Sequence, residues 1–118
     1  MAWVRIDDTF WSNPKLQRLS DRAFRLWMRS LGYCNQHLTD GVLDDVALRT
    51  LGATTKVCDE LVVAGCFDPV PDGGYAIHDY LHFQESRETI LARRRRAAER
   101  KAAQRGKANQ HPATGRFT

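Results

Sequence analysis

Apolar and polar positions alternate in short blocks over the first twenty residues of the chain. Val4 and Ile6 flank Arg5 with the two-residue period of a strand, which predicts a short strand at this point. Asn13 followed by Pro14 is typical of a helix start, because asparagine caps the first turn and proline has no N–H to satisfy. We therefore expect a short strand followed by a short helix.

A longer amphipathic helix is expected after Ser20, whose side chain is typical of an N-cap. Arg22, Arg25 and Arg29 fall largely on one side of this helix. The apolar face predicted for the other side comprises Phe24, Trp27, Met28 and Leu31. This pattern indicates an ordinary helix packed on a core, with solvated arginines that need no ligand to explain them.

Two short helices are predicted in the middle of the chain, over residues 46–51 and 56–64, after an edge strand at 42–43. Gly52 and Gly65 follow the two helices, as glycine does where a helix ends in the left-handed conformation. The candidate N-caps are Asp44 or Asp45 for the first helix and Thr54 or Thr55 for the second. Two short helices joined by a glycine-containing turn are typical of a helix-turn-helix.

A β-hairpin is predicted next, because the strand-like segments 66–70 and 75–78 flank a turn with two glycines at 71–74. Pro69 and Pro71 place the first strand of the hairpin at a sheet edge and keep it short, since proline cannot donate to a ladder. The order of elements is then helix, strand, helix, helix and hairpin. That order is the layout of a winged helix, in which the hairpin is the wing.

The expected fold class is therefore mainly α (α+β), with a winged helix-turn-helix domain over residues 1–85. A long basic helix is predicted over 86–106, because residues 87–105 contain neither glycine nor proline and are rich in helix formers. Gly106 is expected to end this helix. The polar tail at 107–118 is expected to be disordered.

Charge is divided unevenly along the chain. Residues 1–86 carry a net charge of −4, whereas residues 87–118 carry +8. Such a division is typical of a folded body with a basic arm for a polyanion. The arm residues expected to contact phosphates are Arg93, Arg94, Arg95, Arg96, Arg100, Lys101, Arg105 and Lys107. A solvated helix that only aids solubility is the alternative, and RNA is as good a ligand as DNA by these criteria.

The third helix would be the recognition helix of a helix-turn-helix, with its first residues at base edges. Thr54, Thr55 and Lys56 are the residues expected to contact DNA there. The same helix carries Asp59 and Glu60, and one lysine with two acids is a poor surface for a phosphate-lined groove. The alternative is that this domain binds a protein rather than DNA.

Catalytic, metal and cofactor chemistry is not expected. His78 and His82 are four residues apart but lack the glutamate of a zinc-protease motif. Zinc binding by Cys34 and His37 with two further cysteines would match no standard ligand spacing. The cysteines are expected to be buried and reduced; they are Cys34, Cys58 and Cys66. No apolar run reaches membrane-spanning length and no signal peptide is evident, so we expect a cytoplasmic protein without a membrane partner.

Four segments together resemble the N-terminal winged-helix domain of bacteriophage replisome-organiser and DnaD-like helicase-loader proteins, and phage helix-turn-helix DNA-binding proteins. These segments are residues 6–15, Ala23–Trp27, Leu61–Phe67 and His78–Arg87. The resemblance implies a part in starting DNA replication, with DNA and replication proteins as partners. Longer members of the family carry a second domain where this chain has a basic tail, which favours a DNA-binding or regulatory role over helicase loading.

The function expected from the sequence is therefore that of a non-enzymatic, phage-type DNA-binding protein acting in replication initiation or transcription control in the host cytoplasm. The alternative is a winged-helix interaction module that binds a host or phage replication or transcription protein. Self-association is also expected, because one small helix-turn-helix buries little surface on DNA and specific binders of this class are often dimers.

Overall fold

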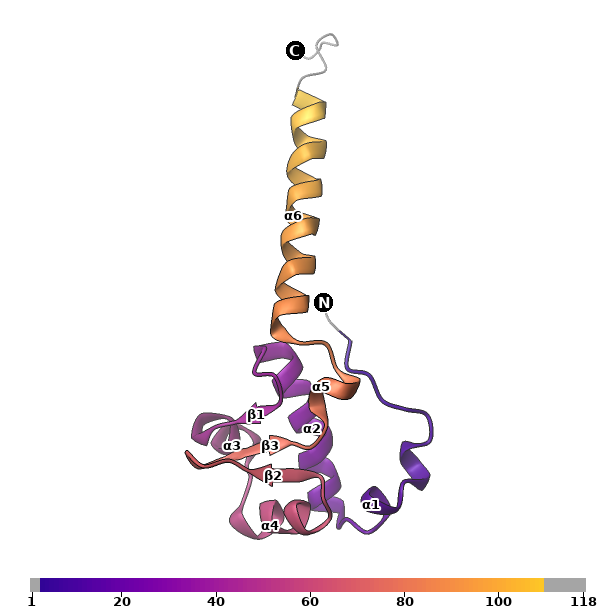
Figure 1. Cartoon of the computed structure of the whole chain (residues 1–118), viewed down its shortest axis with the longest axis vertical. Helices are drawn as coiled ribbons and strands as arrows, with labels where there is room; N and C mark the ends of the chain where they lie inside the picture. The colour runs from indigo at the N-terminus through magenta and orange to yellow at the C-terminus, as the bar shows by residue number, and fades with distance from the viewer. Residues whose placement is uncertain (1–2, 110–118) are drawn as a thin grey trace. The chain divides into compact units, whose positions relative to one another are not determined.

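The computed structural model describes residues 3–109, and the chain divides into two units, Met1–Arg87 and Glu88–Thr118. The chain is mainly helical with one small sheet (Figure 1). Its helical elements are η1 (Phe10–Ser12), α1 (Pro14–Gln17), α2 (Asp21–His37), α3 (Asp45–Leu51), α4 (Thr55–Val63), α5 (Tyr80–Phe83) and α6 (Arg87–Asn109). Its strands are β1 (Val42–Leu43), β2 (Phe67–Pro69) and β3 (Tyr75–Ile77).

The three strands form an antiparallel sheet in the order β1-β3-β2. The predicted hairpin is β2 and β3, in which Phe67 pairs with Ile77. Both β1 and the proline-containing β2 lie at sheet edges, as predicted. Gly74 in the hairpin turn has a φ of +87°, and a Cβ there would lie 2.3 Å from the carbonyl oxygen of Leu43. The close approach of β1 to the turn therefore requires glycine at this position.

The predicted starts and ends of the helices are confirmed at several positions. The side chain of Asn13 accepts a hydrogen bond from the N–H of Lys15, and Pro14 is the first residue of α1. The other N-cap side chains that accept backbone hydrogen bonds are Ser20 for α2, Asp44 for α3 and Thr54 for α4. Gly52 ends α3 in the left-handed conformation. The segment from α1 to α4 thus begins and ends its helices at several of the positions that the local sequence predicts.

Helix α2 supplies the centre of the core through a face that includes Leu31, as predicted, but not the three larger residues expected beside it. Its buried apolar residues are Ala23, Leu26, Leu31 and Cys34. Phe24, Trp27 and Met28 are only half-buried, so they are not the main core face. The reason is that Phe24 stacks on Phe10 of the N-terminal segment, with 6.4 Å between ring centroids. The large aromatic residues of α2 thus cover the core from the side rather than fill it.

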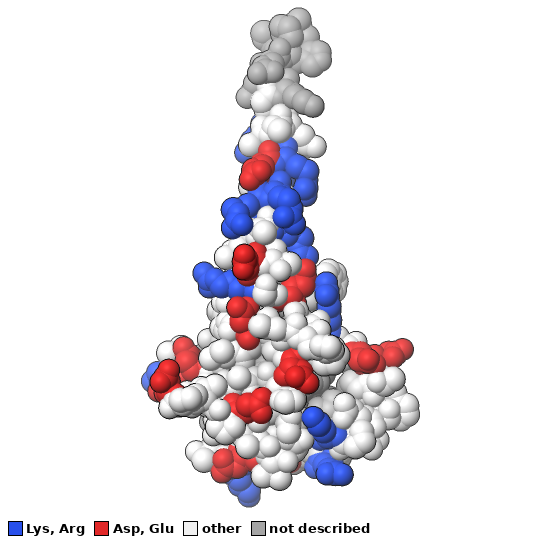
Figure 2. Space-filling view, viewed as in Figure 1, with Lys and Arg blue, Asp and Glu red and all other residues white. Residues whose placement is uncertain are grey.

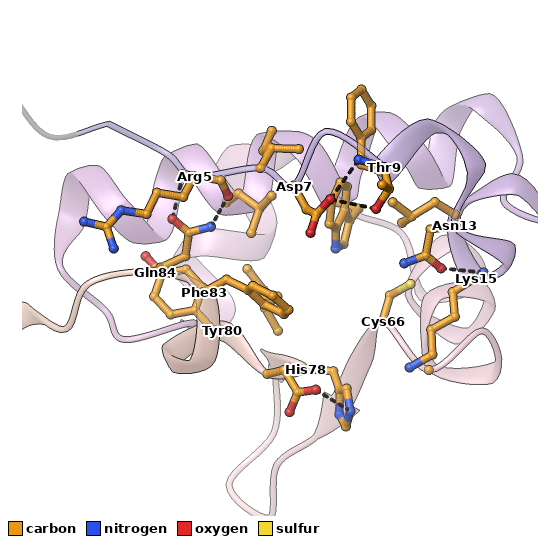
Figure 3. A pocket seen from close by; sticks show the side chains of 18 residues that line it. Arg5, Asp7, Thr9, Asn13, Lys15, Cys66, His78, Tyr80, Phe83 and Gln84 are labelled. Carbon is orange, nitrogen blue, oxygen red and sulfur yellow. Dashed lines mark hydrogen bonds and ion pairs between the residues drawn. The ribbon is translucent and has the colours of Figure 1, made fainter.

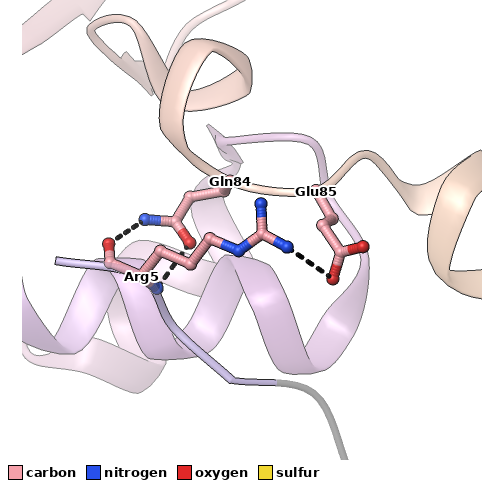
Figure 4. A network of polar contacts seen from close by, with 3 residues as sticks. All are labelled: Arg5, Gln84 and Glu85. Atoms are coloured by element: carbon pink, nitrogen blue, oxygen red, sulfur yellow. Dashed lines mark hydrogen bonds and ion pairs between the residues drawn. The ribbon is translucent and has the colours of Figure 1, made fainter.

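The strand predicted around Arg5 is absent, and this expectation was wrong. The backbone there is extended, but its hydrogen-bonding partner is the side-chain amide of Gln84 rather than a strand (Figure 4). Arg5 N–H donates to Gln84 Oε1 at 2.9 Å, and Gln84 Nε2 donates to the Arg5 carbonyl at 2.5 Å. The side-chain amide of Gln84 pairs with the backbone of a single residue, so no strand ladder extends from this contact.

The segment after the hairpin contains a short helix, α5, that was not predicted. It begins after Asp79, which has a φ of +56°, and it buries Tyr80. The Tyr80 ring lies beside Gly41, where an added Cβ would come within 2.6 Å of Tyr80 Cβ. Burial raises the pKa of the Tyr80 hydroxyl to about 12. Four residues with one buried aromatic carry too little periodicity to be recognised as a helix from sequence.

Helix α6 is longer than predicted. It continues through Gly106 to Asn109, so the prediction that Gly106 ends it was wrong. A glycine within a helix costs about 1 kcal/mol relative to alanine, and the helix formers Lys107 and Ala108 follow it here. Residues 107–109, which were predicted to belong to a disordered tail, are helical, and the rest of the predicted tail at 110–118 lies outside the described residues.

Candidate nucleic-acid interface

Helix α6 carries a dense set of basic side chains. From Arg87 to Asn109 it contains nine lysines and arginines and only two acids, Glu88 and Glu99. Seven of the basic residues predicted to contact phosphates are exposed, namely Arg93, Arg94, Arg95, Arg96, Arg100, Lys101 and Arg105. The eighth, Lys107, lies within the helix. The helix therefore presents positive charge along most of its length (Figure 2).

The basic residues fall into two rows on α6. With 3.6 residues per turn, residues three, four or seven apart lie on the same face of a helix. One row comprises Arg93, Arg96 and Arg100, and the other comprises Arg94, Lys101 and Arg105. At 1.5 Å per residue each row runs for roughly 10–17 Å along the helix axis. An extended polyanion could therefore meet several cations from one side.

Most of these charges have no ion-pair partner among the described residues. Arg94, Arg95 and Arg96 make no ion pair within residues 3–109, and the same holds for Arg100, Lys101 and Arg105. From Arg93 onwards the helix has no large apolar side chain either. This part of α6 is thus polar on all sides, which is uncommon for a helix that packs on a core.

The start of α4 holds the other residues predicted to contact DNA. Thr55 and Lys56 are exposed in its first turn. Thr54 is exposed too, but its hydroxyl accepts a hydrogen bond from the N–H of Val57 at 3.3 Å. Thr54 therefore has a capping role whatever else it contacts. These three residues belong to the first unit, whereas the predicted arm residues belong to the second.

Glu60 is held by the start of α2, so it does not share with Asp59 the free acidic surface that the sequence indicated for α4. Its carboxylate accepts hydrogen bonds from the N–H of Ser20 at 2.6 Å and from the Ser20 hydroxyl at 2.8 Å. The two donors lower the pKa of Glu60. This contact spans 40 residues of sequence, so no local pattern could have shown it. The exposed face of α4 then comprises Thr55, Lys56, Asp59 and Val63.

The first unit also contains a basic groove that the sequence did not predict. Arg22, Arg25 and Arg29 of α2 line a cavity of about 310 Å³ together with the α3–α4 turn, residues 51–54. Arg29 Nη1 donates to the carbonyl of Leu51 at 3.0 Å, which ties α2 to the end of α3. The only sequence signal was the spacing of the arginines on one face of α2. We refer to this cavity as the arginine groove.

A second pocket, of about 300 Å³, lies between the N-terminal segment and the segment that joins β3 to α5 (Figure 3). Trp27, Tyr80 and Phe83 contribute apolar lining. The Asp7 carboxylate at its edge accepts hydrogen bonds from the N–H and hydroxyl of Thr9, at 2.8 and 2.6 Å, which lower the pKa of Asp7. The pocket joins two of the segments that carry the family resemblance, and one of its lining residues, Gln84, holds the backbone of Arg5 in the N-terminal segment.

His78 is exposed and lies beside two carboxylates, whereas the three cysteines are buried. His78 Nδ1 lies 2.9 Å from Asp68 Oδ2, and His78 Nε2 lies 3.4 Å from Asp79 Oδ2. The three cysteines are buried and unpaired, as predicted, and burial raises the pKa of each thiol. Within residues 3–109 no three His, Cys, Asp or Glu side chains come together as a metal site would require.

Comparison with models of known protein families, with curated proteins and with solved structures gives no significant match for this chain. The resemblance to phage replication proteins therefore stays a prediction. Among the described helices, none has the length and apolar character to cross a membrane.

Proposed function

We propose that this protein is a non-enzymatic, phage-type DNA-binding protein that acts in replication initiation or transcription control in the host cytoplasm. The observation that carries the proposal is a set of six exposed basic side chains on α6 that form no ion pair within the described residues, namely Arg94, Arg95, Arg96, Arg100, Lys101 and Arg105. Their attraction for a polyanion does not depend on base sequence, because phosphates are present at every step of a nucleic acid. In this proposal α6 supplies affinity, and the first unit supplies orientation or contacts to other proteins.

We further propose that the first unit is a winged helix. The order α2, β1, α3, α4, β2, β3 and the sheet order β1-β3-β2 support this assignment. In such a domain α3 and α4 form the helix-turn-helix, and the β2–β3 hairpin is the wing. Thr55 and Lys56 would then lie where a recognition helix first meets base edges.

The proposal is tested by measuring binding of the full chain to duplex DNA, single-stranded DNA and RNA at two salt concentrations. If six cations of α6 contact phosphates, the slope of log K against log salt should be about −5 on duplex DNA. A variant with six α6 cations changed to glutamine should lose most of this slope and of the affinity. The six are Arg94, Arg95, Arg96, Arg100, Lys101 and Arg105.

A matched control keeps the charge and the helix-forming tendency of α6. It replaces four alanines of the same helix with glutamine, namely Ala97, Ala98, Ala102 and Ala103. This control should bind like the natural chain. Equal, salt-insensitive binding by the natural chain and the six-residue variant would rule out the role proposed for α6, and preferential binding of RNA would move the proposal to that ligand.

A protein-interaction module is the second candidate, and the outer face of α4 favours it. Asp59 is exposed there, and an acidic side chain is unfavourable in a phosphate-lined groove. The variant Asp59→Lys separates the two functions, because it should weaken a protein contact and spare or improve DNA binding. Glu60 is unsuitable for this test, since its carboxylate holds Ser20.

A further inference from the structure

The arginine groove stands out against the charge of the unit that contains it. Residues 1–86 hold twelve acids and eight lysines and arginines. Three of those eight, Arg22, Arg25 and Arg29, line this one groove. Among the described residues that line it, none is an aspartate or a glutamate. The first unit is acidic overall, but it therefore has one cavity lined by three arginines and by no carboxylate.

The arginines of the groove differ in how far the fold uses them. Arg29 donates one hydrogen bond to the Leu51 carbonyl, which leaves other N–H groups of its guanidinium available. Arg22 and Arg25 are exposed and form no ion pair within residues 3–109, although Asp21 precedes them in the first turn of the same helix. Structural use thus accounts for one arginine of the three and leaves two without a role in the fold.

The other wall of the groove has the same electrostatic sign. It is formed by Leu51, Gly52, Ala53 and Thr54, and Thr54 caps α4. The first N–H groups of a helix have no partner within the helix, and the N-terminal end carries partial positive charge. The groove therefore combines two free guanidinium groups with the positive end of a nine-residue helix.

We infer that the arginine groove binds a phosphate group. A guanidinium presents its N–H donors in a planar fork that matches two phosphate oxygens, and several such donors around one cavity suit a tetrahedral dianion or a phosphodiester. The favoured source is a backbone phosphate of nucleic acid, and this choice rests on the function proposed above. A free phosphate-bearing molecule is the other source of the same chemistry.

The groove and α6 are separate contributions to nucleic-acid binding in this scheme. They belong to different units, and the groove lies beside the helix-turn-helix rather than on the basic helix. One additional phosphate contact should add about one to the magnitude of the salt slope. The groove would thereby fix the position of the helix-turn-helix on the nucleic-acid backbone. Helix α6 alone would bind that backbone without orienting the first unit.

The test uses the full chain and compares two double variants that remove the same charge. The variant Arg22→Ala with Arg25→Ala removes two of the three arginines that line the groove and keeps the contact between Arg29 and Leu51. Arg18→Ala with Arg49→Ala removes two exposed arginines of the same unit that do not line the groove. Binding to a duplex oligonucleotide is measured against salt, and backbone amide shifts at residues 52–56 are followed by NMR during titration with the duplex and, separately, with inorganic phosphate.

The groove variant should bind duplex DNA about tenfold more weakly than its charge-matched control, with a salt slope smaller in magnitude by about one. The amides at 52–56 should shift with duplex in the natural chain and not in the groove variant. Equal affinities of the two variants with unmoved amides would overturn the inference while leaving the role of α6 intact. Shifts with inorganic phosphate in a chain that binds no DNA would support the phosphate site, assign it to a free ligand and refute the proposed function.

Discussion

The carboxylate of Glu60 in α4 accepts two hydrogen bonds from Ser20, one from its backbone N–H and one from its hydroxyl. Ser20 is itself the N-cap of α2, and its hydroxyl oxygen accepts from the N–H of Ala23 at 3.2 Å. Ser20 thus links the start of α2 to α4. A side chain that looks like part of a binding surface in the sequence is part of the scaffold.

We predict that Glu60→Gln lowers the urea midpoint of unfolding at pH 7, whereas Asp59→Asn on the exposed side of α4 leaves it nearly unchanged. The pKa of Glu60 in the folded chain is below 4.5, the ordinary value of a glutamate, so the contribution of the ionised carboxylate is complete above pH 4.5. That contribution is lost as pH falls through the lowered pKa. The difference between the natural chain and Glu60→Gln should therefore shrink below pH 4.5. A pH-independent difference would contradict the role given to the ionised carboxylate.

Gln84→Ala should destabilise the first unit by about 1–3 kcal/mol, because it leaves the N–H and carbonyl of Arg5 without their partner. Arg5→Ala is the matched control. It keeps both backbone hydrogen bonds and removes only the ion pair with Glu85, in which the arginine side chain is 61% exposed. Such pairs contribute little, so its effect should be below about 1 kcal/mol. Denaturant unfolding of the two variants measures both values, and equal effects would contradict the importance of the Gln84 amide.

The two glycines of the hairpin turn offer a sharp comparison. Gly73 and Gly74 share a φ of +87°, but an added Cβ at Gly73 meets nothing within 4 Å, whereas one at Gly74 meets the Leu43 carbonyl oxygen. Gly73→Ala should cost about 1–2 kcal/mol for its left-handed backbone. Gly74→Ala should cost clearly more, because β1 must also move. Thermal unfolding of both variants checks the order, and a reversed order would place β1 away from the turn.

The three thiols should react slowly with an aromatic disulfide reagent in the native chain at pH 8. Cys34, Cys58 and Cys66 are each at most 6% exposed, and burial raises the pKa of each thiol, so few thiolates are present and access is poor. In denaturant all three should react rapidly. Fast reaction of one thiol under native conditions, followed by mass spectrometry of the labelled peptide, would identify a cysteine whose surroundings differ from those described.

Local sequence predicted the parts of this fold that local chemistry determines. Capping side chains such as Asp44 and Thr54 and the left-handed Gly52 act within a few residues, so their effect can be recognised without knowing the tertiary structure. The hairpin and the edge position of Pro69 follow from the same kind of reasoning. The basic residues of α6 could also be recognised from the sequence, because their density along the chain indicates a basic helix without any tertiary information.

Tertiary contacts decided the features that the sequence did not reveal. The aromatic residues of α2 looked like its core face, but Phe10 covers Phe24 and the smaller Ala23 faces the core instead. The arginine groove needed the α3–α4 turn to lie against α2 before its arginines shared a cavity. Long-range pairs of this kind leave no periodicity in the sequence, and hydrophobic patterning alone treats a bulky residue as the most buried one.

The four consecutive arginines of α6 also make the helix itself responsive to its ionic surroundings. Arg96 and Arg100 are four residues apart on one face, where like charges repel and reduce helix stability. Added salt screens this repulsion, so it should raise the helix content of α6 even as it weakens attraction to a polyanion. A bound polyanion would neutralise this row of arginines and thereby stabilise the helix. The affinity measured for such a ligand then includes the free energy by which binding stabilises helix α6.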